Sequence, residues 1–174
     1  MNGLDSWFAM QRDRLDANVW LDLTLRTARL DALVSAEYFG AAQRSLTTLY
    51  ALIEQHRLPE WRVFVQLTES ALVLASTGNV GRALDTSMEA LTASEIMRSA
   101  EHLPLRQAAR LGVMRCWLKV DEVGYAPMVL SIGEQVLSDG SAGGWAYWFR
   151  AVMAWALWAL GRQDEADCVL TEMQ

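Results

Sequence analysis

Apolar side chains recur every three to four residues along most of the chain, which is the spacing of helices that each bury one stripe. One stripe is formed by Phe64, Leu67, Ala71 and Leu74. Pro59, Pro104 and the Gly-rich segment 138–144 interrupt this pattern. The pattern predicts helices near residues 5–17, 18–35, 39–56, 60–77, 80–100, 104–119, 124–138, 145–160 and 163–173.

The predicted turns repeat a local pattern in which a small residue ends one helix and an alanine follows five positions later. Gly161 precedes Ala166 in this way, and Gly78 precedes Ala83. Asp121 replaces the turn glycine before Ala126, and the copy that ends at Ala42 is the weakest. The four alanines are spaced 41, 43 and 40 residues apart, and a near-constant period is typical of a solenoid.

The repeat predicts an all-α fold that forms one domain over residues 1–174. We expect about four helical hairpins, near residues 18–56, 60–100, 104–138 and 145–173, with an N-terminal helix before them. Each hairpin would shield its apolar stripe only by packing on its neighbours.

Composition narrows the class of protein further. Apolar residues make up 52% of the chain with only 3 prolines, which favours a packed helical fold over disorder. The net charge of −6 argues against a nucleic-acid partner. The most apolar stretch, 145–160, contains Arg150 and is shorter than the roughly 20 residues that a membrane span requires. We therefore expect a cytoplasmic protein with no membrane partner.

The sequence offers little catalytic chemistry. Cys116 and Cys168 lie 52 residues apart without further ligands nearby, so we expect buried free thiols and neither a disulfide nor a metal site. His56 and His102 are expected to lie near helix C-termini, where an imidazole interacts favourably with the free carbonyl groups. No phosphate-binding loop or nucleophile elbow is present. We expect no enzyme activity and no cofactor.

The segment 160–166, Leu-Gly-Arg-Gln-Asp-Glu-Ala, resembles the inter-helix signature of tetratricopeptide repeats, and segment 77–84 is similar to it. The period near 41 exceeds the standard repeat and resembles longer units in bacterial regulators of the maltose-activator type. The resemblance implies a right-handed α-α superhelix whose first helices line a groove for a peptide or a partner helix. It places these residues on the groove side: Val65, Thr68, Leu72, Ser76, Leu111, Arg115, Leu118, Lys119, Trp148, Ala151, Trp155 and Trp158.

Tryptophan is concentrated near the C-terminus. Trp148, Trp155 and Trp158 share one face of a predicted helix, which is either a binding surface rich in aromatic anchors or a face that packs within the array. Arg115 and Lys119 are four residues apart and either clamp a carboxylate of a partner or lie on a solvated face.

These features together predict a non-catalytic scaffold or adaptor that binds another protein or peptide in a helical-repeat groove. The expected contacts are Trp148, Trp155, Trp158, Arg115, Lys119 and Thr68. Two alternatives stay open. The chain is a chaperone for a secreted protein, or it is a self-assembling repeat fragment of a larger regulator, which would make a homo-oligomer.

Overall fold

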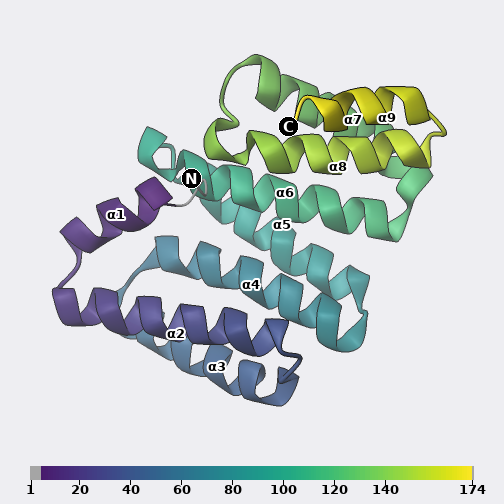
Figure 1. The fold of residues 1–174 in the computed structure, drawn as a ribbon. Coiled ribbons are helices and arrows are strands. Elements are labelled where there is room, and N and C mark those ends of the chain that lie inside the picture. Colours follow the sequence, from purple (N-terminus) through teal and green to yellow (C-terminus); the bar gives the residue numbers. More distant parts are fainter. Residues whose placement is uncertain (1–4, 174) are drawn as a thin grey trace.

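The computed structural model describes residues 5–173, and within them the chain is all-α, as the sequence predicts (Figure 1). The helices are α1 (Asp5–Arg14), α2 (Ala17–Ser35), α3 (Phe39–His56), α4 (Pro59–Thr77), α5 (Val80–Ile96), α6 (Leu103–Val120), α7 (Glu122–Ser138), α8 (Ala146–Ala159) and α9 (Gln163–Thr171). Two short 3-10 helices, η1 (Ala100–His102) and η2 (Gly143–Trp145), precede α6 and α8.

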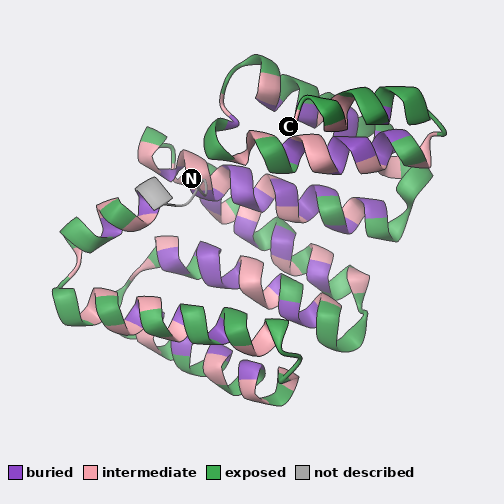
Figure 2. Ribbon diagram, in the orientation of Figure 1, coloured by how far each residue is buried: buried purple, intermediate pink, exposed green. Residues whose placement is uncertain are grey.

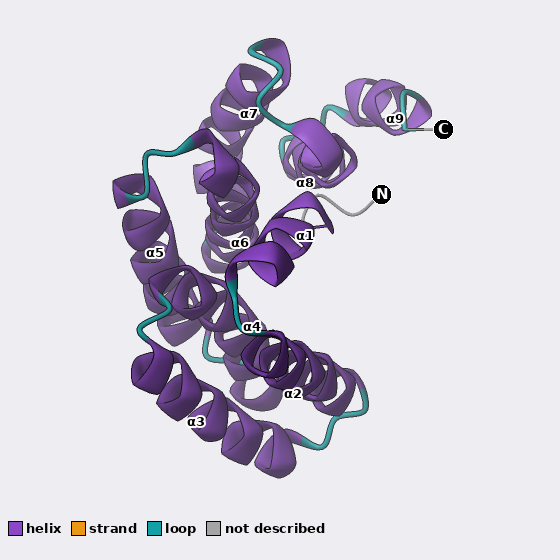
Figure 3. Ribbon diagram, turned by 90° about the vertical axis from the view of Figure 1, so that its left-hand side faces the viewer, coloured by secondary structure: helices purple, strands orange, loops and turns teal. Residues whose placement is uncertain are grey.

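Helices α2 to α9 form four antiparallel hairpins that pack one after another. Figure 3 shows that the hairpins follow a curve, with α3 and α5 on its outer side and α1 on its inner side. Buried residues concentrate on the sides of α4, α6 and α8 that face neighbouring helices (Figure 2). The stack therefore leaves one curved inner surface formed by the first helix of each hairpin.

The four alanines that define the repeat are fully buried at equivalent places in their hairpins. Ala42, Ala83, Ala126 and Ala166 are all 0% exposed. Each lies in the first turn or two of the second helix of its hairpin, where a methyl group lets that helix pack tightly. The equivalence predicted from the sequence is confirmed for all four hairpins.

The hairpin turns use left-handed or capping residues at the predicted positions. Gly78 and Gly161 adopt φ values of 64° and 73°, which glycine accommodates without strain. In the first hairpin Glu37 takes the same conformation with φ 61°, five residues before its alanine. In the third hairpin Asp121 is instead an N-cap, because its carboxylate accepts a hydrogen bond of 2.9 Å from the Gly124 amide.

Two clusters of buried side chains make up most of the core. The first joins α1 to α4 around Trp7 and Trp61 and reaches Ala90 of α5 and Leu105 of α6, and the second joins α6 to α9 around Phe149. Partly buried Trp145 packs against both clusters. The apolar interior thus continues along the stack, as expected when each hairpin is covered by its neighbours.

Three local predictions were wrong. Cys116 is buried as expected, but Cys168 of α9 is exposed. His102 does not lie at a helix C-terminus, because the predicted helix 80–100 ends at Ile96. Pro104 occupies the first turn of α6, where its missing N–H costs nothing. His102 is therefore buried at the start of α6, 3.7 Å from the Glu60 carboxylate, whereas His56 lies in the last turn of α3 as predicted.

Candidate functional site: an inner groove

A groove of about 650 Å³ occupies the inner side of the curve. Its walls come from α2, α4, α6 and α8, which are the first helices of the four hairpins. Ser87 of α5 contributes to its floor. Ligand pockets commonly enclose about 300–1,000 Å³, so the groove is large enough for a small molecule or a short peptide segment.

The two sides of the groove differ in chemistry. The α2 side presents hydroxyl and carboxylate groups from Thr24, Asp31 and Ser35. The opposite side is formed by Leu111 of α6 and Val152 of α8, together with Trp145 and Trp148, and it also carries Arg115 of α6. Such a groove favours a guest that combines apolar and charged groups.

Two tryptophans form much of the apolar side. Trp148 of α8 is 52% exposed, although it lies beside the fully buried Phe149. Trp145 is half-buried and comes from η2. An exposed indole on a rigid helix supplies contact area at low entropic cost, which is why tryptophan is common in binding hot spots.

The floor of the groove is closed by a satisfied polar cluster. The Ser70 hydroxyl donates to the Ala83 carbonyl at 2.8 Å and lies 2.8 Å from the Ser87 hydroxyl. The Cys116 thiol is 4.0 Å from Ser70 Oγ and 3.9 Å from Ser87 Oγ. Because these groups bond one another, the floor needs no guest to satisfy it.

Asp31 and Arg115 are the two charged residues among the described residues that line the groove. Within residues 5–173 neither side chain forms an ion pair or a hydrogen bond. Asp31 still contacts water, but the groove walls displace part of its solvent, and this desolvation raises the pKa of its carboxyl. Two opposite charges therefore face the groove without partners.

Of the six predicted contact residues, three line the groove and three do not. Thr68, Arg115 and Trp148 line the groove. Lys119 and Trp155 instead contact each other one turn further along α6 and α8, with the Lys119 ammonium 5.5 Å from the indole centre. The Trp155 Nε1 donates to Glu122 at 3.1 Å, and this contact ties α8 to the start of α7.

The remaining predicted contact, Trp158, is 54% exposed near the end of α8 and does not line the groove. Three residues assigned to the groove side by the resemblance lie in the core instead. Val65, Leu72 and Leu118 are at most 1% exposed, so the prediction was wrong for them. Each helix of the stack is apolar on two sides, and spacing alone does not separate the groove side from the side that packs on the next hairpin.

Helix α1 also contributes to the groove, which the sequence did not predict. Trp7 is 1% exposed and packs against Trp61 and Phe64, with ring centres 5.3 and 5.9 Å away. Phe8 lines the groove beside Phe64. Arg14 anchors the end of α1 through two hydrogen bonds to Glu101, at 3.0 and 2.8 Å. Helix α1 thus closes one end of the groove.

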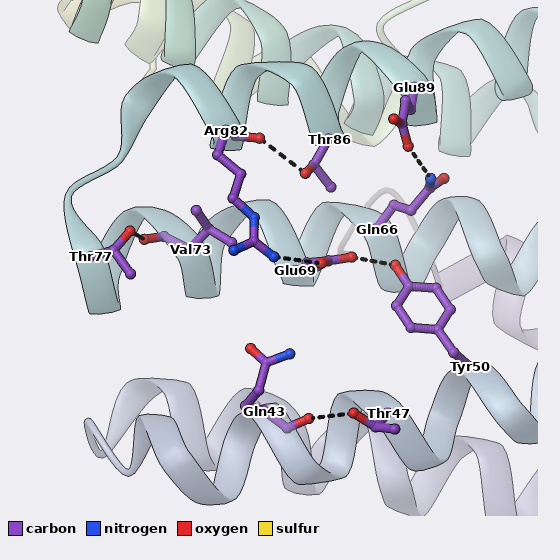
Figure 4. Close-up of polar contacts among 10 residues, drawn as sticks. All are labelled: Gln43, Thr47, Tyr50, Gln66, Glu69, Val73, Thr77, Arg82, Thr86 and Glu89. Carbon is purple, nitrogen blue, oxygen red and sulfur yellow. Dashed lines mark hydrogen bonds and ion pairs between the residues drawn. The ribbon is translucent and has the colours of Figure 1, made fainter.

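A polar network on the other side of α4 holds the first two hairpins together (Figure 4). The Tyr50 hydroxyl of α3 donates to Glu69 of α4 at 2.6 Å, and Arg82 of α5 lies 3.9 Å from the same carboxylate. Burial, followed by the hydrogen bond to Glu69, raises the pKa of Tyr50 well above its usual value. Every member has a partner, which is consistent with a structural role.

The described residues contain no group of three or more His, Cys, Asp or Glu side chains arranged to hold a metal ion. None of the helices in that part of the chain has the length and apolarity needed to cross a bilayer. Comparisons with protein-family models, with curated proteins and with solved structures give no match. The tetratricopeptide resemblance and the right-handed superhelix that it implies therefore stay predictions.

Proposed function

We propose that this protein is a non-catalytic scaffold or adaptor that binds a segment of a partner protein in its inner groove. The observation that carries this proposal is that all four hairpins direct their first helix toward one groove. The groove exposes apolar side chains and unpaired charges. A helical array that binds no partner would be expected to bury such apolar groups and to pair such charges.

The chemistry of the groove supports binding over catalysis. Its floor holds the hydroxyls of Ser70 and Ser87 and the thiol of Cys116, which contact one another, and none of the described residues that line the groove is a histidine. A nucleophile without a neighbouring base is not activated for attack on a substrate. Exposed Trp148 and unpaired Arg115 are instead the residue types that dominate binding energy at protein interfaces.

A peptide-display selection tests the proposal. Peptides selected on the wild-type protein would be measured against Thr68→Arg, which places a long side chain in the groove, and against Trp148→Ala. We expect both variants to weaken binding by about tenfold or more, in line with the loss of a hot-spot contact.

Thr92→Arg is the matched control, because Thr92 is exposed on α5 and lies outside the groove. The same chemical change there should leave peptide affinity unchanged. Thermal unfolding would verify that all three variants stay folded. If the selected peptides bind Thr68→Arg as tightly as wild type, or if Thr92→Arg weakens them equally, the groove is not the binding site.

A second candidate is head-to-tail self-association, the alternative predicted from the repeat. It is favoured by apolar side chains exposed near opposite ends of the stack, with Leu25 of α2 60% exposed and Trp158 of α8 54% exposed. An unpaired end of a repeat array is prone to association. Light scattering over a range of concentrations would test this, and Leu25→Lys should abolish any oligomer that uses this end.

A further inference from the structure

The two unpaired charges of the groove occupy equivalent positions in different hairpins. Asp31 and Arg115 each precede the anchor alanine of their hairpin, Ala42 or Ala126, by 11 residues. One lies on α2 and the other on α6, and α4 lies between these helices (Figure 1). The charges therefore face the groove from its two sides, and the line that joins them crosses the helices rather than running along them.

The separation of the charges indicates the size of the guest. Packed helices lie about 8–10 Å apart, so two steps from α2 to α6 span roughly 16–20 Å. An extended peptide advances about 3.3 Å per residue and covers that distance in roughly five or six residues. A helix rises only about 1.5 Å per residue and needs roughly 11 to 13 residues for the same span.

The groove volume favours the extended form. A helical guest of that length is a cylinder about 10–12 Å wide, which occupies roughly 1,700 Å³. An extended segment that occupies one strand spacing of about 4.8 Å and one sheet spacing of about 10 Å takes up roughly 860 Å³. The groove has a volume of about 650 Å³ and is open on one side, and this volume is closer to that of the extended segment than to that of the helix.

Charge then sets the chemistry of the two ends of the guest. A cationic side chain near Asp31 would restore the interactions that the carboxylate lost when the groove walls displaced its water. An acidic side chain near Arg115 would find a guanidinium with no other partner in residues 5–173. Between these ends the guest would cross α4, where Leu67 and Ala71 line the groove and call for apolar side chains.

We propose that the groove recognises an extended, dipolar peptide segment whose basic residue pairs with Asp31 and whose acidic residue, five or six positions away, pairs with Arg115, with apolar residues between them. This proposal rests on the proposed function and defines the partner of the same groove. The pairs supply specificity and a fixed direction of binding, while Trp148 and the apolar side supply contact area.

Synthetic peptides with the same apolar centre provide the test. One peptide has Lys before the centre and Glu after it, a second has the reverse order, and a third has Gln at both positions. Isothermal titration at low salt measures their affinities for the wild-type protein. We expect one order to bind about tenfold more tightly than the Gln peptide, a difference that shrinks as salt screens the charges.

The double variant Asp31→Lys with Arg115→Glu reverses the groove dipole and should reverse the preferred order. Both side chains are exposed, so the variant should fold, and thermal unfolding would verify this. The matched control is Asp85→Lys with Arg44→Glu, which makes the same changes at exposed positions outside the groove. This control should keep the wild-type preference.

The outcomes separate the two proposals. Binding of all three peptides with equal affinity, or an order preference that the double variant does not reverse, would overturn the dipolar proposal and leave the groove as a binding site. If no peptide binds, including those obtained by display selection, the proposed function itself fails. A helical guest would show itself by tighter binding when the charges are spaced 11 to 13 residues apart, and that result would also overturn the extended form.

Discussion

Gly133 of α7 packs directly against Met153 of α8, and replacing it tests the packing between hairpins that holds Trp148 in the groove. A Cβ atom at Gly133 would overlap Met153 Sδ and would lie 2.6 Å from Met153 Cγ. Both atoms are well inside the normal contact distance, and Met153 is only 7% exposed. The Gly133→Ala change must therefore displace Met153 or separate the two helices.

The expected magnitude follows from two opposing effects. Alanine within a helix gains about 0.8–1.0 kcal/mol over glycine. Overpacking a well-filled core costs about 1–3 kcal/mol, and the upper half of that range applies because the overlap involves inner atoms of the Met153 side chain rather than its terminal methyl. We expect Gly133→Ala to lower the free energy of unfolding by about 1–2 kcal/mol.

Gly112 of α6 provides the matched variant. A Cβ atom there would lie 3.4 Å from Ser87 Oγ and 3.5 Å from Leu67 Cδ2, which are ordinary contacts. Gly112→Ala should therefore keep most of the helix gain and raise the free energy of unfolding by about 0.5–1 kcal/mol. Because Gly112 lines the groove, the added methyl should also weaken a peptide that reaches the floor.

Urea titration followed by circular dichroism measures both variants, provided that the slope of the transition is unchanged. We expect the two alanine variants to differ by about 2 kcal/mol, with wild type between them. Equal stabilisation of both would show that α7 and α8 do not pack as closely as the Gly133 contact indicates, and the position of α8 beside the groove would then need revision.

Four further outcomes are expected. The fold raises the pKa of Tyr50 and so favours its protonated form. The stability that this shift contributes is fully present below the unfolded pKa of about 10 and is lost as pH rises above it. Tyr50→Phe should therefore flatten the loss of stability that is measured on titration from about pH 9 to 11. Gly161→Ala forces alanine to φ 73° and should cost about 1 kcal/mol in urea titration. Glu37→Gly, at φ 61°, should instead raise the melting temperature, because glycine relieves about 1 kcal/mol of strain. Asp121→Ala removes the N-cap of α7 and should cost about 1 kcal/mol, and a Ser replacement should recover most of it.

The fold was largely predictable because the strongest constraints are local. The residue that ends a helix and the alanine five positions later belong to the same turn between two helices. The pattern around Gly78 and Ala83 can therefore be recognised without knowledge of distant contacts. The same pattern located the first hairpin even though Glu37 stands where glycine was expected. The largest error in a helix boundary lies between residues 96 and 103, where a 3-10 turn replaces the end of the predicted helix, and the first helix ends at Arg14 instead of residue 17.

The groove was predictable only in part, because it depends on how hairpins pack on one another. Thr68 and Arg115 were placed on the groove side and line it, but Leu72, with the same helical spacing, is buried between helices. Asp31 was missed, although its position 11 residues before Ala42 matches that of Arg115 before Ala126. The contribution of Phe8 could not be predicted, since nothing in its segment shows that α1 folds back onto α4.

The two polar regions of the molecule show why the groove, and not the outer side, is the place to look for a partner. On the outer side Tyr50, Glu69 and Arg82 satisfy one another, so the network is complete without a guest. In the groove Asp31 and Arg115 are both exposed, and neither forms an ion pair or a hydrogen bond within residues 5–173. Partial burial by the groove walls raises the pKa of the Asp31 carboxyl, and Arg115 across the groove is not among the causes of the shift. Charges that have no internal partner are available to an external group, whereas those of the outer network are not.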